Sequence, residues 1–356
     1  MAKQMSWTNA ARQLTPYGKA AVKHLTSLRS WQLKHVARNT GITTSGKKSD
    51  TANDLVCALS NIGSHSVYKS VDMGVKNLAV CVVRPNIDGL TRKSSAHFTL
   101  HHWERSDILT TGTQGADEEQ RTGGDDDPPV SMPGAYSPSN LAPHAARMAY
   151  QLKTDHKPSH ILIERQRFRS MGGAAVQEWT LRVNSLEAML WASIETMKQG
   201  ELRRQTNMKL AQTFFPEVIE MSPARIAAFW NGRGSDWSLE EEGVEQLIPE
   251  DSKNPKKQAV ELEDRAKRGM EKSEKISLVK NWLQTGSVDV VAPLQSLANA
   301  FMQTGRARKV DGDVVVSKKD DLADCVVQGV TWGLVERNRR TLHKYLSSVP
   351  EVEGIS

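Results

Sequence analysis

Short alternating runs of apolar residues predict a β-sheet in the middle of the chain. The run from Tyr68 to Val83 predicts a strand, a tight turn at Gly74 and a second strand. Alternation in residues 98–103 predicts a third strand, and the apolar runs 160–164 and 218–221 predict two more. Strands that come first and helices that alternate with strands later predict an α/β core.

Apolar side chains at helical spacing predict the helices around this core. In residues 24–60, Leu33 and Val36 continue an apolar face that begins at Leu25, and Gly41 is a typical helix stop. Two short helices are therefore predicted in this segment. Further helices are predicted at residues 142–153, 176–197, 224–230, 276–283 and 321–346.

Composition divides the chain into a basic arm (1–23), a helical module (24–62) and a main domain (66–346). Two stretches of the main domain, about 104–140 and 231–275, contain few large apolar residues and many charged, Gly, Pro or Ser residues. Such stretches are typical of insertions between the elements of a fold.

The helical module resembles a SAP module, a small helix-extended-helix motif that binds DNA. The resemblance is carried by Leu33-Lys34, Gly41-Ile42 and the spacing of Gly46 and Lys48. It implies that Lys47 and Lys48 contact DNA. A plain helical hairpin is the alternative interpretation of the same pattern.

Charge is distributed unevenly along the chain. The net charge is +6, yet residues 1–49 alone carry nine Lys or Arg and no Asp or Glu. Such a segment is typical of an arm that binds phosphates, and its composition is also typical of a mitochondrial transit peptide. We therefore expect contact with DNA, a location in the mitochondrial matrix, or both.

The bulk composition, 38% hydrophobic and 25% charged, is that of a soluble globular protein. Apolar runs are far too short to span a bilayer, so no membrane association is expected. Cys57, Cys81 and Cys325 lie far apart without metal-ligand spacing, which is typical of buried thiols in a reducing compartment. No P-loop and no GxGxxG motif is present, and no nucleotide cofactor is expected.

Carboxylates stand at the ends of two predicted strands. Asp72 ends the first strand and Glu164 closes the apolar run 160–164. A buried carboxylate is costly unless it binds a cation or accepts hydrogen bonds. Asp72 could instead cap its own turn, and the spacing Asp-x-Gly-x-x-Asn from Asp72 to Asn77 also occurs in a phosphate loop of the actin and sugar-kinase ATPases.

A third acidic segment opens the last predicted helix. Asp321 and Asp324 share one helix face, as do Asp320 and Asp324. The helix dipole favours carboxylates at this end, but three exceed what a cap needs. With Asp72 and Glu164 they form a set of oxygen ligands suited to Mg²⁺ and to phosphodiester cleavage.

Basic side chains flank both acidic segments. Three arginines alternate directly after Glu164, so that in an extended segment they would project to one side and hold phosphates. Phe168, which lies among them, would stack on a base. A solvated basic loop with Phe168 in the core is the alternative. The candidate DNA-binding residues here are Arg165, Arg167, Phe168, Arg169, Lys318 and Lys319.

Together these segments resemble the fungal mitochondrial Holliday junction resolvases, which are RuvC-like members of the RNase H-like superfamily. The matching stretches are 70–79, 163–170 and 318–324, within a resemblance from about 69 to 338 that excludes the insertions. It implies an RNase H-like mixed sheet flanked by helices. It also implies a homodimer that cuts four-way junction DNA symmetrically with Mg²⁺, or with Mn²⁺ in its place.

The resemblance also assigns roles to particular residues. Asp72, Glu164, Asp321 and Asp324 correspond to the family's catalytic, metal-binding acidic quartet, with Asp320 as the alternative to Asp321. The alternating arginines correspond to its DNA-contacting stretch. The long helix that follows them corresponds to one that pairs across a two-fold axis.

Three other functions stay open. A different RNase H-like nuclease, acting on RNA–DNA hybrids, would share the acidic set. A non-catalytic junction-binding protein would need only the basic segments, and this alternative does not explain the four carboxylates. An ATPase would need a second glycine-rich phosphate loop and an adenosine-binding glycine pair, and neither is evident.

Overall fold

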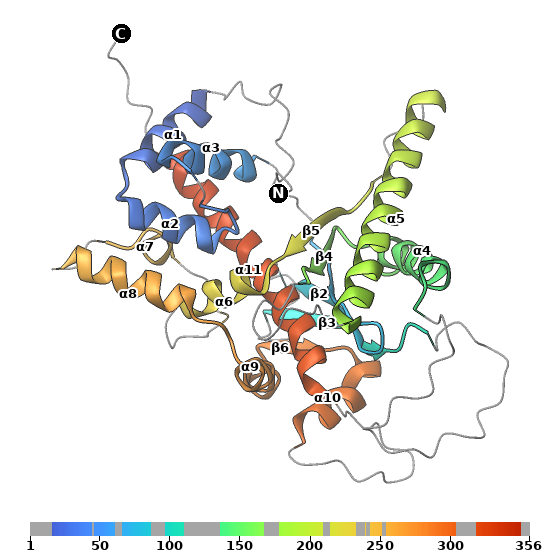
Figure 1. Ribbon diagram of the computed structural model, residues 1–356. Coiled ribbons are helices and arrows are strands. Elements are labelled where there is room, and N and C mark those ends of the chain that lie inside the picture. Colours follow the sequence, from blue (N-terminus) through green and yellow to red (C-terminus); the bar gives the residue numbers. More distant parts are fainter. Residues whose placement is uncertain are drawn as a thin grey trace. The chain divides into compact units, whose positions relative to one another are not determined.

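The computed structural model describes residues 16–44, 46–60, 66–86, 97–109, 136–166, 178–208, 214–232, 239, 243–250, 254–303 and 318–349. The chain forms two compact units, each assembled from distant segments (Figure 1). The sheet unit comprises His65–Pro223 and Met270–Val330. The helical unit comprises Met1–Ser64, Ala224–Gly269 and Thr331–Ser356.

The sheet unit is built on a six-stranded mixed sheet with the order β5-β4-β1-β2-β3-β6. The strands are β1 (Tyr68–Asp72), β2 (Leu78–Pro85), β3 (Phe98–Ser106), β4 (His160–Glu164), β5 (Glu217–Met221) and β6 (Val288–Val290). β1 pairs antiparallel with β2 and parallel with β4. The carboxyl ends of β1 and β4 therefore lie side by side.

Helices cover both faces of this sheet. α4 (Pro138–Thr154) and α5 (Glu178–Met208) pack on one face, where Val71, Val80 and Ile163 belong to the same apolar cluster as Leu186 and Leu190. α11 (Lys319–Ser348) begins on the other face, where Trp103 Nε1 donates a hydrogen bond of 3.0 Å to the Leu322 carbonyl.

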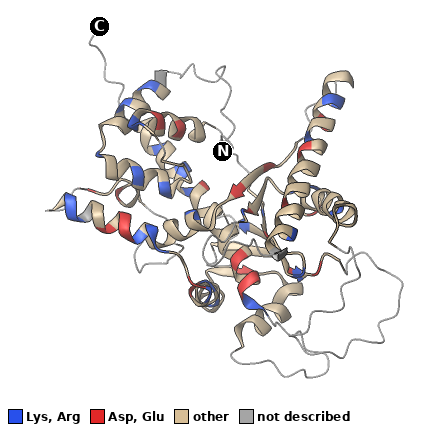
Figure 2. Ribbon diagram, in the orientation of Figure 1, with Lys and Arg blue, Asp and Glu red and all other residues tan. Residues whose placement is uncertain are grey.

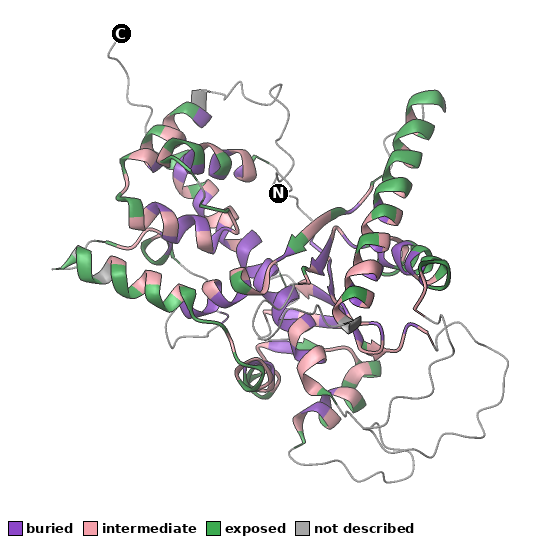
Figure 3. Ribbon diagram, viewed as in Figure 1, coloured by how far each residue is buried: buried purple, intermediate pink, exposed green. Residues whose placement is uncertain are grey.

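Alternation along β1 decides which side chains meet α11. Val71 points to α4 and α5, whereas Ser70 meets Gln328 of α11. Asp72, two residues after Ser70, shares its face and thus faces α11. Buried residues concentrate in the strands and in the part of α11 next to them (Figure 3).

The rest of the sheet unit follows the strands in the chain. α9 (Lys272–Thr285) precedes β6, and a 3₁₀ turn (Ala292–Leu294) leads into α10 (Gln295–Met302). Among the described residues, none of the helices has the length and apolar character needed to cross a bilayer.

The helical unit contains α1 (Pro16–Ser27), α2 (Ser30–Asn39), α3 (Lys48–Leu59), most of α6 (Pro223–Gly232), α7 (Val244–Leu247), α8 (Pro255–Lys267) and the end of α11. Its apolar core joins Leu25, Leu33 and Leu55 to Leu342 and Leu346 of α11. The helices predicted as a SAP-like module therefore share one core with residues from the end of the chain. The SAP-like assignment and the predicted domain boundaries stay predictions.

Two helices, α2 and α3, lie within residues 24–60, but the prediction missed α1, which ends at Ser27 inside this segment. The apolar face that begins at Leu25 is divided between α1 and α2. Arg29 has an extended backbone (φ −65°, ψ 151°) and its N–H donates to Gln32 Oε1 at 2.8 Å, which starts a new helix at Ser30. A capping interaction thus interrupts an apolar pattern that continues across the break.

Other boundaries also differ from the sequence prediction. β3 continues to Ser106, into the predicted insertion 104–140, and α4 begins at Pro138. β6 and α10 were not predicted at all. The predicted insertion 231–275 holds α7, α8 and the first turn of α9, while residues 110–135 of the other lie outside the described residues.

Candidate metal centre

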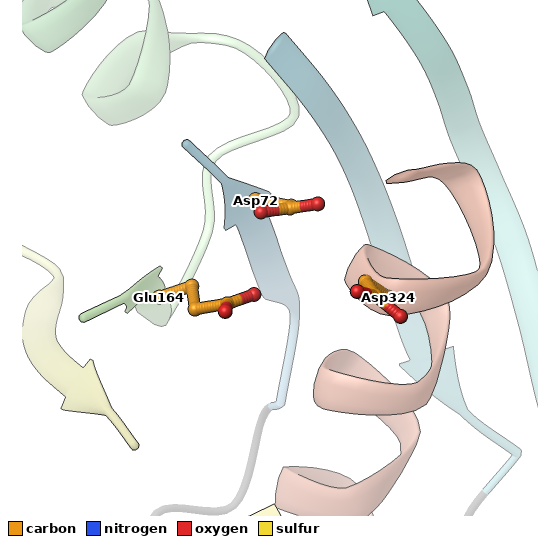
Figure 4. Close-up of side chains that lie close together, drawn as sticks. All are labelled: Asp72, Glu164 and Asp324. Atoms are coloured by element: carbon orange, nitrogen blue, oxygen red, sulfur yellow. The ribbon is translucent and has the colours of Figure 1, made fainter. Parts of the chain in front are cut away.

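Three carboxylates from distant parts of the sequence meet at one end of the sheet. Asp72 ends β1, Glu164 ends β4 and Asp324 lies in the second turn of α11. One oxygen of each lies within 4.8 Å of the other two. Figure 4 shows the three side chains grouped between the strand ends and the helix.

Local backbone structure brings Asp72 to this position. The β1 register pairs Val71 with Ile163, so Asp72 and Glu164 are the next residues along two adjacent parallel strands. The chain turns tightly after Asp72. In this turn a Cβ at Gly74 would lie only 2.9 Å from the Asn77 carbonyl oxygen. Glycine is therefore required where the chain reverses beyond the carboxylate.

The electrostatic environment of Asp72 is unfavourable to its charged form. Burial, followed by the neighbouring carboxylates of Glu164, Asp324 and Asp321, raises the pKa of Asp72 well above its usual range. Like charges held close together in a partly buried site disfavour one another's ionisation. A bound cation would remove this repulsion.

Asp321 and Asp320 have different surroundings, although they are adjacent in sequence. Burial, and then Asp320, raise the pKa of Asp321, and its buried Oδ2 has no hydrogen-bond partner. Burial alone would raise the pKa of Asp320, but the Lys272 ammonium in contact with it holds that pKa below its usual range. After burial, Glu164 and Asp324, Asp321 is among the groups that raise the pKa of Asp72.

Gln328 connects β1, β4 and α11, the elements that carry the trio of carboxylates Asp72, Glu164 and Asp324. Its side chain is buried one helical turn beyond Asp324. Nε2 donates to Ser70 Oγ at 3.0 Å and to the Leu162 carbonyl at 3.1 Å, and it also contacts the Val71 carbonyl at 3.3 Å. These partners come two residues or fewer before Asp72 and Glu164, so the amide holds α11 in register with both strand ends.

Lysines from α9 contact the acidic end of α11. Lys275 Nζ lies 2.9 Å from Asp324 Oδ1, and both side chains are more than four-fifths buried. Lys272 contacts Asp320 and is largely exposed. Figure 2 shows the acidic residues gathered at this end of the helix. The sequence analysis did not find Lys272, Lys275 or Gln328, because neither their spacing nor their residue type distinguishes them from ordinary helix residues.

The donor set fits a hard divalent cation. All three residues of the trio offer carboxylate oxygens, which Mg²⁺ and Mn²⁺ prefer. The crowding of like charge and the unpartnered oxygen of Asp321 are further features that a cation would satisfy.

The predicted DNA-binding residues are only partly within the described structure. Arg165 Nε lies 3.0 Å from Glu220 Oε1 of β5. Lys319 Nζ donates to the Gln303 carbonyl at 2.5 Å, and Lys318 is exposed. Lys47 and Lys48 lie at the start of α3 in the helical unit, where Lys47 is exposed and Lys48 half-buried. Arg167, Phe168 and Arg169 lie outside the described residues.

Comparison with known proteins identifies the family. The family described as "Mitochondrial resolvase Ydc2 / RNA splicing MRS1" matches residues 69–342, which is more than half of the chain. The chain belongs to this family. The predicted resemblance is thereby confirmed.

A curated relative and a solved structure agree with this membership. The mitochondrial cruciform cutting endonuclease 1 of Schizosaccharomyces pombe is 29% identical over 198 residues, covering 56% of this chain and 65% of that protein. The alignment thus spans slightly less than two thirds of the relative. The crystal structure of the yeast mitochondrial Holliday junction resolvase Ydc2 is similar with a TM-score of 0.52 and 21% identity, covering 88% of this chain and 97% of that chain. The predicted mixed sheet flanked by helices is confirmed.

Proposed function

We propose that this protein is a divalent-metal-dependent endonuclease that resolves four-way DNA junctions. The observation that carries the proposal is the trio Asp72, Glu164 and Asp324, whose oxygens lie within 4.8 Å of one another. A carboxylate cluster of this kind can hold Mg²⁺ at a phosphodiester bond.

Family membership alone does not separate cleavage from binding, since the family's description names both a resolvase and an RNA splicing protein. The curated relative is named as an endonuclease that cuts cruciforms, which contain four-way junctions. Burial and then the neighbouring carboxylates raise the pKa of Asp72, and a protein that only binds nucleic acid gains nothing from the repulsion among these carboxylates. The acidic trio therefore favours a nuclease.

The carboxylates and Gln328 have different roles in the proposed reaction. Asp72, Glu164 and Asp324 would hold the metal, together with Asp321, whose buried Oδ2 has no hydrogen-bond partner. When bound, Mg²⁺ or Mn²⁺ supplies an activated water and stabilisation of the leaving oxygen. Gln328 keeps the strand ends and α11 in register, so that the carboxylates converge before DNA arrives.

DNA contacts come from the basic residues, by phosphate binding that depends on salt. Arg165 follows Glu164 directly and would exchange Glu220 for a phosphate. The remaining proposed contacts are Arg167, Phe168, Arg169, Lys318, Lys319, Lys47 and Lys48.

We further propose a homodimer, because a two-fold arrangement of sites matches a junction with two strands to cut. Its location would be the mitochondrial matrix, in line with the mitochondrial names of the family and the relative.

Cleavage of a labelled four-way junction with Mg²⁺ tests the proposal, beside a matched duplex and an RNA–DNA hybrid. Wild type should place symmetric nicks in the junction alone. Asp72→Asn should abolish them while junction binding persists. Asp289→Asn removes a carboxylate exposed on β6 and is the matched control that keeps activity.

Two outcomes would contradict the proposal in different ways. Cleavage of the hybrid with an intact junction would keep the metal centre and reject the substrate. Binding without cleavage of any substrate, unchanged by Asp72→Asn, would favour the binding function that the splicing protein's name suggests. Comparing Asp320→Asn with Asp321→Asn in the same assay identifies which of them acts with Asp324.

A further inference from the structure

The first turn of α9 brings two lysines to the acidic end of α11, three residues apart and on one face. Lys272 contacts Asp320, and Lys275 contacts Asp324. The two pairs differ in their exposure. The side chain of Lys272 is 75% exposed, whereas that of Lys275 is 18% exposed and lies beside an aspartate that is 17% exposed.

Asp324 therefore belongs to two arrangements at once. One of its oxygens is within 4.8 Å of Asp72 and Glu164, and its Oδ1 lies 2.9 Å from Lys275 Nζ. At this distance the ammonium forms a close ion pair with Oδ1, so Lys275 places a positive charge directly on a candidate ligand oxygen. Burial raises the pKa of Asp324, and Lys275 acts against this rise. Lys275 is thus a largely buried cation in direct contact with the carboxylate cluster.

We propose that Lys275 is an internal counter-cation that competes with divalent metal for Asp324. The inference rests on the proposed function, since it concerns the metal of that same centre. An ammonium close to a ligand oxygen repels an incoming divalent ion, and the repulsion is strong where water is partly excluded. Lys275 must therefore move before Asp324 can give both oxygens to metal.

The consequence is an order of metal binding. With Lys275 in place, Asp72, Glu164 and Asp324 would hold one ion firmly. A second ion would bind weakly until the phosphates of DNA add negative charge to the site. Cleavage would then be limited to protein that has already bound its substrate.

Titration of the full-length protein with Mn²⁺ in the absence of DNA tests this inference, by calorimetry and by the electron paramagnetic resonance of free Mn²⁺. Lys275→Met should bind the weaker Mn²⁺ about tenfold more tightly than wild type, because one nearby positive charge is removed. Lys275→Arg keeps the charge and should match wild type. Lys272→Met removes the exposed neighbouring lysine and is the matched control, with little expected change.

Unchanged or weaker Mn²⁺ binding by folded Lys275→Met would overturn the inference, and Lys275 would then only join α9 to α11. If Lys275→Met does not fold, Lys275→Gln provides the same neutral test with a polar side chain. No Mn²⁺ binding by wild type and Lys275→Met alike would overturn both this inference and the proposed function. Tighter binding by Lys275→Met without junction cleavage by wild type would contradict the proposed function alone.

Discussion

The two ends of α11 bury polar groups in opposite ways. At the start of the helix, in the sheet unit, Asp321 and Asp324 lie near Asp72 and raise its pKa. Near its end, in the helical unit, Glu336 and Arg339 form an ion pair of 2.7 Å in which both side chains are largely buried. The same helix thus carries part of a cluster of like charges at its start and an ion pair of opposite charges further along.

The matched pair is embedded in further hydrogen bonds. Arg339 Nε donates to the Thr40 carbonyl at 2.9 Å, and the guanidinium lies 5.0 Å from the ring centroid of Trp332. Asn338 Nδ2 donates to the Asn39 carbonyl at 3.0 Å. These side chains connect the end of α11 to the end of α2, which is a structural role.

The difference separates structural from functional burial of charge. Opposite charges with satisfied hydrogen bonds can persist in a folded protein for the sake of its conformation. Like charges in a partly buried site lower stability, so their presence indicates a ligand that neutralises them. Substitutions at the two ends should therefore have opposite effects on stability.

The largest effect is expected for Glu164→Gln. Loss of this carboxylate should slow junction cleavage about a thousandfold, because metal-assisted catalysis contributes several kcal/mol. The metal-free protein should become more stable, since an amide replaces a charge beside Asp72 and can donate a hydrogen bond to it. Single-turnover cleavage and urea unfolding in a chelator measure the two effects, and a less stable variant would count against the functional interpretation of this cluster.

Arg339→Met should have the next largest effect and the opposite character. It leaves Glu336 buried without its partner, which typically costs about 3–5 kcal/mol. The protein that remains folded should cleave junctions at the wild-type rate. Urea unfolding measures the loss, with Lys344→Met, an exposed cation on the same helix, as the control. A stability loss no larger than that of the control would show that the pair is not the structural element described here.

Much of the acidic site was predictable, because its residues occupy positions with a strong local pattern. Asp72 and Glu164 each end a run of buried strand residues, and a carboxylate there is conspicuous. The prediction was weaker at α11, where three aspartates within five residues gave two possible pairs on one helix face, Asp321 with Asp324 and Asp320 with Asp324. The structure shows that Asp320 contacts Lys272, a difference between the two pairs that the sequence does not reveal.

The remaining parts could not be predicted for physical reasons. Lys275 and Gln328 act through contacts with residues 49 and more than 150 positions away, for which no local pattern exists. β6 has three residues, too few for an alternating signal. The core of the helical unit joins Leu25 to Leu342, a long-range contact that helical periodicity does not specify.

Gln328→Leu should have an intermediate effect at the functional end of α11. Leucine has a similar volume but cannot donate to Ser70 Oγ or the Leu162 carbonyl, so the helix is less firmly held against the strand ends. Cleavage should fall about tenfold, consistent with the loss of one or two hydrogen bonds. Gln328→Glu offers no amide donor and should not restore it, whereas Gln328→His keeps an N–H and should restore part of it. A Mn²⁺ titration shows whether metal affinity falls in parallel, which a purely structural loss would not produce.

The smallest effect is expected for Lys69. This buried cation tests whether a hydrogen bond and an ion pair fully offset the free-energy cost of burying its charge. Its Nζ donates to the Gln151 carbonyl at 2.7 Å near the end of α4 and lies 3.9 Å from Asp155 Oδ2. Burial nevertheless lowers the pKa of Lys69 to about 8 from 10.5. Between these values the unfolded chain binds more protons than the folded one, so stability rises with pH. From pH 7 to pH 9 the gain from this group should be about 1 kcal/mol. Lys69→Met should remove that gain. Urea unfolding at pH 7 and pH 9 measures it. If the wild-type unfolding free energy instead falls over this range while that of the variant stays level, the hydrogen bond and ion pair of Lys69 more than offset the cost of its burial.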